Sequence, residues 1–111
     1  MKEMMDVLES EEQFYELIQE DKTHVFVFSA DWCPDCVYIK PFLPELIKKY
    51  SQYVFVYVDR DAYIDLCIDH EIMGIPSFVV YRQGKEIGRF VSKLRKTKEQ
   101  IDDFLSSMLE K

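Results

Sequence analysis

Two cysteines separated by two residues are the part of this chain with the clearest chemical potential. They lie in the segment Trp32-Cys33-Pro34-Asp35-Cys36, and thiols at this spacing can close into a disulfide and reopen. The apolar segment Val25-Phe26-Val27-Phe28 before it indicates a buried strand, so we expect the cysteines at a strand-to-helix junction. The pattern is typical of a redox-active pair, and two buried structural thiols are the alternative.

The residues between the cysteines predict a different role for each thiol. Pro34 suits the first position of a helix, where a missing N–H costs nothing, and this places Cys33 at the N-cap. Free backbone N–H groups and the helix dipole would stabilise a thiolate there. Cys36 would lie one turn further on, less exposed and within reach of Cys33. We therefore predict Cys33 as the nucleophile and Cys36 as its resolving partner, with Asp35 as a like charge beside the thiolate.

Composition limits the class of protein. The chain has 111 residues, 48% of them hydrophobic, which predicts one domain over residues 1–111. A net charge of -7 argues against nucleic acid or an anionic membrane as partner and favours a monomer. No apolar run approaches the ~20 residues that span a bilayer, and the first residues lack the apolar core of a signal peptide. Three cysteines are too few for a secreted disulfide framework, so we expect a cytoplasmic protein with a transient disulfide.

The hydrophobic pattern predicts strands that alternate with helices. Parallel strands joined by a right-handed crossover are expected from the strand, helix, strand order. One long helix follows the cysteine motif, with a kink at Pro41 because proline removes a backbone donor. The expected strands are 24–29, 54–58, 78–81 and, after a turn at Gln83-Gly84, 85–91; the expected helices are 11–20, 34–50, 62–72 and one that begins after Thr97.

Several further segments accompany the cysteine pair, and together they resemble the thioredoxin family from Phe14 to Leu109. They are Ala30-Asp31 before the motif, Pro41, Asp59 at the end of a strand, Gly74-Ile75-Pro76-Ser77 and the turn at Gly84. The resemblance implies an α/β thioredoxin-like fold, a central mixed β-sheet flanked by helices on both faces. It also implies a cis Ile75–Pro76 peptide bond packed against the cysteine pair.

The resemblance further implies a protein-disulfide reductase that contributes to cell redox homeostasis. Such a protein needs no bound cofactor or metal, acts on disulfide-containing proteins and receives electrons from a thioredoxin-reductase-type donor. Pro76 would shape the substrate groove, the Ile75 backbone would pair with the substrate, and Trp32 and Ser92 would border it. A thiol oxidase or isomerase is the alternative within this chemistry, and a redox-sensing or scaffolding module without general reductase turnover is the alternative outside it.

The sequence departs from the family inside and below the motif. Pro34-Asp35 stands where Gly-Pro is usual, which is similar to a smaller group of thioredoxin-related disulfide reductases. The family's buried Asp and its Lys on the neighbouring strand correspond to Val27 and Phe55. The absence of both the Asp and the Lys is physically reasonable, because a lone buried charge is costly and an apolar pair is not. Proton handling at Cys36 is therefore expected to differ from the family's.

Two other groups of residues have more than one interpretation. Cys67 is predicted to be a buried inert thiol, although Cys33, Cys36, Cys67 and His70 could also form a tetrahedral zinc set. A run of basic residues late in the chain predicts a solvated loop, or a patch that steers an acidic partner. This run consists of Arg89, Lys93, Arg95, Lys96 and Lys98.

Overall fold

Strand β2 (Thr23–Ser29) lies at the centre of a five-stranded sheet in the computed structural model, which describes residues 1–111. The strand order is β1-β3-β2-β4-β5. Strands β1 (Asp6–Val7) and β3 (Tyr53–Asp59) run parallel to β2, whereas β4 (Ser77–Arg82) and β5 (Lys85–Phe90) form an antiparallel hairpin beside it. The central mixed β-sheet that the resemblance implied is confirmed.

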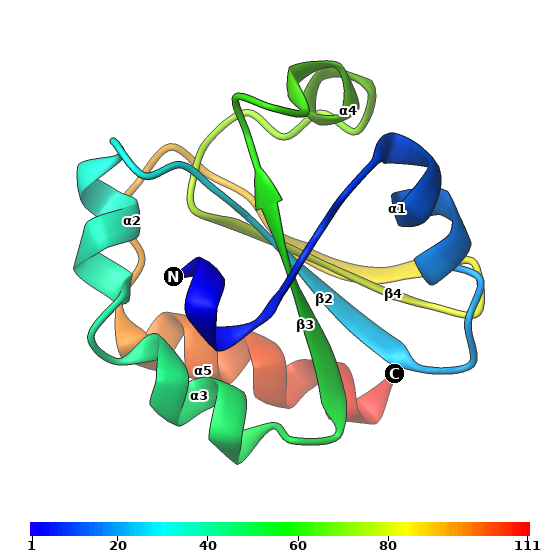
Figure 1. Ribbon diagram of the computed structural model, residues 1–111. Coiled ribbons are helices and arrows are strands. Elements are labelled where there is room, and N and C mark those ends of the chain that lie inside the picture. The colour runs from blue at the N-terminus through cyan, green and yellow to red at the C-terminus, as the bar shows by residue number, and fades with distance from the viewer.

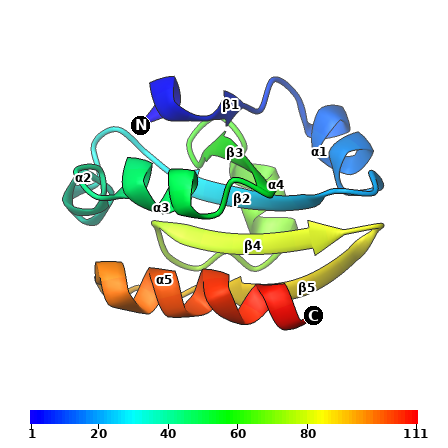
Figure 2. The same ribbon diagram turned by 90° about the horizontal axis from the view of Figure 1, so that it is seen from below.

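Helices cover both faces of this sheet (Figures 1 and 2). Helices α1 (Glu11–Leu17) and α4 (Ile64–Asp69) lie on one face. Helices α2 (Pro34–Ile39), α3 (Leu43–Lys49) and α5 (Lys98–Ser107) lie on the other. Short 3₁₀ turns, η1 (Lys2–Met4) and η2 (Met108–Glu110), flank these elements. No helix has both the length and the apolar composition needed to cross a membrane.

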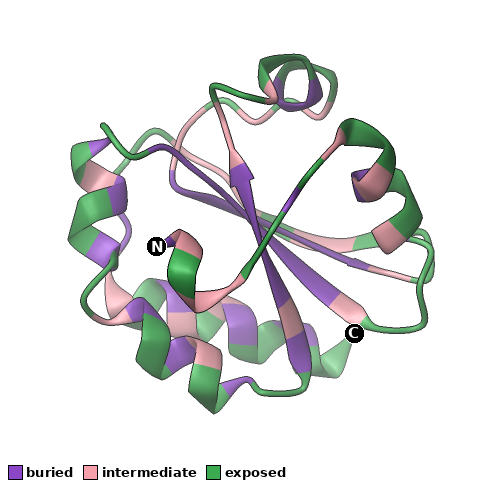
Figure 3. Cartoon of the chain, viewed as in Figure 1, coloured by how far each residue is buried: buried purple, intermediate pink, exposed green.

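The alternation of side chains along β2 divides the interior into two cores. Val25 and Val27 point to the face of α2, α3 and α5, whereas Phe26 and Phe28 point to the face of α1 and α4. All four are buried, as expected of a central strand covered on both sides (Figure 3). Both cysteines of the motif belong to the first core. The redox pair is therefore anchored in the larger of the two apolar clusters.

The single long helix predicted over residues 34–50 is wrong. The chain forms two helices, α2 and α3, separated by a turn at residues 40–42. Pro41 has no N–H to donate to the preceding turn and its ring crowds that turn, so the helix ends instead of kinking. Pro44 is tolerated because it lies in the first turn of α3, where no intrahelical donor is lost.

Most other helix and strand ends were predicted to within a few residues of their positions in the structure. Thr97 forms the complete capping box with Gln100 at the start of α5. At the start of α1 no complete capping box forms: Ser10 accepts from the Gln13 N–H, but the Gln13 side chain accepts from the Glu9 N–H. Strand β1 was not expected, because a two-residue strand is too short to have a hydrophobic period.

The burial of His24 predicts a pH dependence of stability. Its imidazole lies at the start of β2, with Nε2 3.3 Å from a Glu20 carboxylate oxygen and Nδ1 without a partner. Burial lowers the pKa of His24 below the ordinary 6.5. The unfolded chain therefore takes up this proton first as the pH falls, and the free energy of unfolding decreases below about pH 6.5.

We expect His24→Leu to abolish the part of the stability loss at low pH that His24 protonation causes. Wild-type protein and His70→Gln should retain this loss. The measurement is urea unfolding at about pH 7 and about pH 5.5, where the acidic groups contribute equally to each variant. An identical loss in His24→Leu and wild type would show that the imidazole does not cause it.

Candidate active site: the Cys33–Cys36 dithiol

Cys33 lies where the chain leaves β2 and enters α2, as the sequence predicted. It is the N-cap residue, with φ -78° and ψ 118°, and Pro34 follows at the start of the helix. The Cys36 backbone N–H donates to the Cys33 Sγ over 3.2 Å. The sulfur thus takes the place of the capping oxygen that usually satisfies a free helical N–H. A negative charge on this sulfur strengthens the same hydrogen bond.

Cys36 lies deeper in the apolar core than Cys33. The exposed fraction of Cys36 is 1% and that of Cys33 is 4%, and both are free thiols. Burial raises the pKa of Cys36 to about 12, the hydrogen bond with Cys33 adds to the rise, and the Ser29 hydroxyl opposes it. Cys36 is therefore a protonated thiol at neutral pH in the reduced protein.

The Ile75–Pro76 peptide bond is cis, as the resemblance implied. The Cys33 thiol donates to the Ile75 carbonyl over 3.8 Å, so this segment packs directly against the dithiol. Gly74 permits the approach of a third segment, because a Cβ there would lie 2.2 Å from the Ser92 carbonyl oxygen. The structure thus brings the Ile75 carbonyl to Cys33 and the Ser92 carbonyl to the adjacent Gly74.

Trp32 is an exposed residue beside the dithiol, with 59% of its surface accessible. Its indole N–H donates to the Asp61 carboxylate over 2.6 Å, and the Arg60 guanidinium lies 5.2 Å from its ring centre. The loop after β3 therefore holds the ring in place. Neither Arg60 nor Asp61 was singled out from the sequence, because their contact with Trp32 joins residues far apart in the chain.

Asp35, the predicted like charge beside Cys33, forms an ion pair that the sequence did not predict. Its carboxylate lies 2.8 Å from the Arg95 Nε, in the loop between β5 and α5. The Arg95 guanidinium also lies 4.5 Å from the ring centre of Tyr38 on α2. This loop passes close to α2 in Figure 1. The like charge beside Cys33 is thus offset by a cation from another part of the chain.

The predicted solvated loop is confirmed for residues 93–95, which are exposed, but not for Lys96. Arg89 pairs with Glu86 at 2.8 Å, and Lys98 pairs with Glu45 on α3. Lys96 is only 1% exposed and lies in the interior. Lys93 alone is exposed without an ion pair. The sequence placed these residues in one group because they are close along the chain, but Arg89 and Lys98 form ion pairs and Lys96 is buried.

The positions below the motif are apolar, as predicted. Val27 and Phe55 are both buried in the core that contains the dithiol. Tyr57 on β3 is also buried in this core, and its hydroxyl has no hydrogen-bond partner. Burial raises the pKa of Tyr57 to about 12, so it is neutral at ordinary pH. No carboxylate lies beneath Cys36 in this core.

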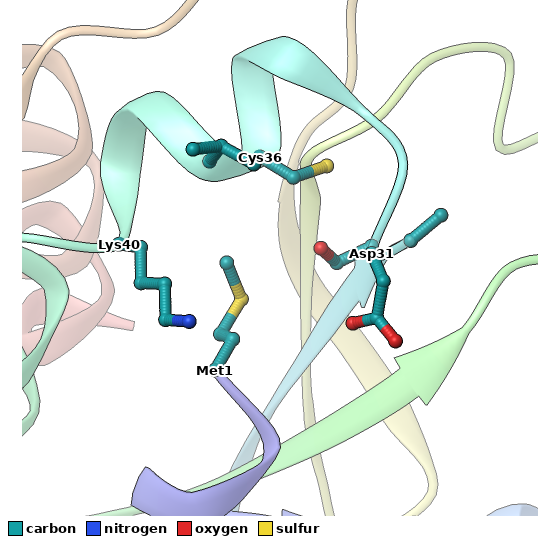
Figure 4. Close-up of a pocket in the computed structure, with 7 residues that line it drawn as sticks. Met1, Asp31, Cys36 and Lys40 are labelled. Carbon is teal, nitrogen blue, oxygen red and sulfur yellow. The ribbon is translucent and has the colours of Figure 1, made fainter.

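A small pocket borders Cys36 on the side of the N-terminal segment. Its volume is about 50 Å³, which is enough for a water molecule. Figure 4 shows the Met1 side chain and the Lys40 amine reaching into the space near Cys36. The pocket is lined by Met1, Ser29, Ala30, Asp31, Cys36, Val37 and Lys40.

The alternative zinc set is wrong, because its members lie on opposite faces of the sheet. Cys67 on α4 belongs to the second core, whereas Cys33 and Cys36 belong to the first. His70 instead hydrogen-bonds the Tyr15 hydroxyl over 3.0 Å. Burial raises the pKa of Cys67 to about 11, which agrees with the prediction of a buried, unreactive thiol.

Comparison with known proteins agrees with this geometry. The family model described as Thioredoxin matches residues 5–107. The chain belongs to the thioredoxin family. Mouse thioredoxin is 42% identical over 89 residues, which cover 78% of this chain and 85% of that protein. Mitochondrial thioredoxin-2 of Schizosaccharomyces pombe is 34% identical over 107 residues, 96% of this chain and 75% of that protein.

Solved thioredoxin structures share the fold. The crystal structure of Trypanosoma brucei brucei thioredoxin superposes with a TM-score of 0.85 at 22% identity, over 96% of this chain and 92% of that one. Mitochondrial thioredoxin 3 of Saccharomyces cerevisiae, in its oxidised form, gives 0.80 at 26% identity, over 93% and 94%. The thioredoxin homologues and the fold support a thiol-disulfide oxidoreductase whose redox pair is Cys33 and Cys36.

The Asp35–Arg95 pair predicts opposite effects for its two members on the Cys33 thiolate. Arg95→Gln leaves Asp35 unpaired and should raise the midpoint pH of Cys33 alkylation, whereas Asp35→Asn should lower it, each by up to about one pH unit. The double variant removes both charges and should lie between the single variants. The measurement is the pH dependence of iodoacetamide alkylation, resolved by mass spectrometry. Shifts of the same sign in both single variants would contradict this.

Proposed function

We propose that this thioredoxin-family protein works as a protein-disulfide reductase in which Cys33 is the nucleophile and Cys36 resolves the intermediate. The observation that carries the proposal is the hydrogen bond from the Cys36 N–H to the Cys33 sulfur. It favours the anionic form of Cys33, and burial keeps Cys36 protonated. The two thiols are therefore not equivalent before substrate arrives, because the Cys33 sulfur accepts a backbone hydrogen bond and Cys36 is a buried, protonated thiol.

The reaction has two exchange steps. The Cys33 thiolate attacks one sulfur of a substrate disulfide, forms a mixed disulfide and releases the other substrate sulfur as a thiolate. Cys36 then gives up its proton and attacks the Cys33 sulfur, which releases the second substrate thiolate. Two electrons pass to the substrate, and the protein ends with a Cys33–Cys36 disulfide. Protons from Cys36 and from water convert the released thiolates to thiols.

The proton of Cys36 does not leave through a buried carboxylate. Val27 and Phe55 supply no acid or base, but the pocket beside Cys36 can hold water. Ser29 lies on this path and its hydroxyl favours the Cys36 thiolate. Water in this pocket, with Ser29 as a hydrogen-bonding partner, accepts the proton as the mixed disulfide resolves.

The substrate is an extended segment that carries a disulfide. It lies against Trp32 and the segment at Ile75 and Pro76, with Ser92 at the border. The Ile75 backbone pairs with the substrate chain, and Pro76 shapes the groove. Exposed apolar side chains surround this area, including Met73 and Leu94, which supports contact with a protein partner.

The electron donor is a protein of the thioredoxin-reductase type, because the reductase chemistry needs no bound cofactor in this chain. The surrounding compartment must be reducing for the dithiol to be regenerated, so we propose a cytoplasmic protein. The net charge of -7 favours a monomer through mutual repulsion.

Two experiments test the roles of the thiols. In insulin reduction with dithiothreitol as electron donor, Cys33→Ser should reduce the rate to the uncatalysed level. Cys36→Ser should accumulate a mixed disulfide with the substrate, which mass spectrometry detects. Cys67→Ser is the matched control and should keep the rate within about twofold, because a buried thiol is inert. Alkylation of Cys36 before Cys33 in the reduced protein would overturn the assignment.

The same assay separates the reductase from the alternative of a redox-sensing or scaffolding module. Multiple turnovers with wild-type protein support the reductase, and a single turnover without regeneration supports the module. A redox titration against glutathione then separates a reductase from an oxidase, since a reductase has the lower potential.

A further inference from the structure

Lys96 is a buried cation that the redox chemistry described above does not use. Its side chain is 1% exposed, although it lies in a loop between β5 and α5. The ammonium donates to the Ser92 carbonyl over 3.1 Å and to the Leu94 carbonyl over 3.2 Å. It also lies 5.3 Å from the centre of the Phe90 ring. Lysine is seldom fully buried unless it is paired, so this position needs an explanation.

The local sequence accounts for the inward direction of this side chain. Thr97 is the N-cap of α5, so Lys96 occupies the position immediately before the cap. That position commonly carries an apolar residue that packs against the fourth helical residue, here the buried Ile101. The backbone therefore directs residue 96 toward the core, and the sequence supplies a lysine where an apolar side chain is usual.

No carboxylate forms an ion pair with the Lys96 ammonium. The acidic residue on the facing helix, Asp35, pairs instead with Arg95. The titratable groups of α2 and its N-cap that interact electrostatically with Lys96 are Asp35, Cys36 and Cys33. Strand β5 contributes only the uncharged ring of Phe90. Tyr57, on the far side of Cys36, is neutral. A buried cation with two carbonyl partners and no paired anion is stabilised whenever the neighbouring dithiol becomes negative.

The loop that carries Lys96 is also fixed to both other parts of the site. Its Ser92 carbonyl packs on Gly74, next to the cis Ile75–Pro76 bond. Its Arg95 side chain pairs with Asp35 inside the motif. The two hydrogen bonds from Lys96 to Ser92 and Leu94 close the loop between these contacts. The ammonium is thus held at a fixed place relative to the two thiols.

We propose that Lys96 is a positioning residue that supplies buried positive charge to the Cys33–Cys36 dithiol. This inference rests on the proposed reductase function, and it assigns to the β5–α5 loop the electrostatic role for which the sequence offers no residue at Val27 or Phe55. Lys96 stabilises the Cys33 thiolate before attack on the substrate. During resolution it stabilises the charge that develops on Cys36 as this thiol loses its proton. It transfers no proton and forms no bond to the substrate.

The test compares Lys96→Met and Lys96→Gln by the pH dependence of iodoacetamide alkylation, with Cys33 and Cys36 resolved by mass spectrometry. Methionine removes the charge and the hydrogen bonds, whereas glutamine keeps two N–H donors without the charge. We expect both variants to raise the midpoint pH for Cys33 and to slow its alkylation about tenfold at neutral pH, because one pH unit is a tenfold change in thiolate.

Lys93→Met is the matched control, since it removes an exposed charge from the same loop. It should leave the midpoint almost unchanged, and about 0.5 M salt should abolish any remaining shift while the effect of Lys96→Met persists. Urea unfolding of each variant shows whether the fold is retained.

Three results are decisive for Lys96. Raised midpoints in both Lys96 variants support the proposal. An unchanged midpoint in Lys96→Met overturns it. A midpoint raised only in Lys96→Met overturns it too, because the hydrogen bonds to Ser92 and Leu94 alone would then explain the effect. Alkylation needs no turnover, so failure of the reductase assay with wild-type protein would count against the proposed function and not against this inference.

Discussion

The chemistry of this protein depends on a negative sulfur that forms where little water can solvate it. Cys33 is 4% exposed, so the protein must supply the stabilisation that water would give a surface thiolate. The first contribution is a backbone N–H, donated by Cys36 to the Cys33 sulfur. That N–H lies in the first turn of α2, where it also donates to the Cys33 carbonyl over 3.1 Å, because the helix begins at Pro34 after the central strand β2 has ended. The position of the helix start therefore decides which backbone donor reaches the Cys33 sulfur.

Three segments far apart in the chain meet around this sulfur. The β2–α2 junction carries the thiols, the cis Ile75–Pro76 segment packs against Cys33, and the β5–α5 loop packs against Gly74. Gly74 is required at this meeting point, because any side chain would overlap the Ser92 carbonyl. The sheet fixes their distances, since β2 and β4 are hydrogen-bonded neighbours.

The charges around the dithiol come from the third segment and not from beneath the motif. Val27 and Phe55 make the interior below Cys36 apolar, which avoids a lone buried charge. Arg95 offsets Asp35, and Lys96 adds a buried cation without a carboxylate partner. The apolar layer below the thiols raises the pKa of Cys36, and we propose that the buried charge of Lys96 opposes this effect. The β5–α5 loop thus contacts the motif through Arg95 and Asp35 and is not only a connection.

The sequence alone determined the parts of this protein that depend on neighbouring residues. The cysteine spacing, Pro34 and the apolar run of β2 predicted the strand, the helix start and the order of the two thiols, and hydrophobic periods gave the remaining main elements. The prediction of one long helix failed at Pro41, where steric crowding ends the helix. Helix propensity does not distinguish a kink from a break. Only the tertiary structure decided the partners of Asp35, Trp32 and Lys96, since an ion pair or the burial of a lysine depends on which distant segments the sheet brings together.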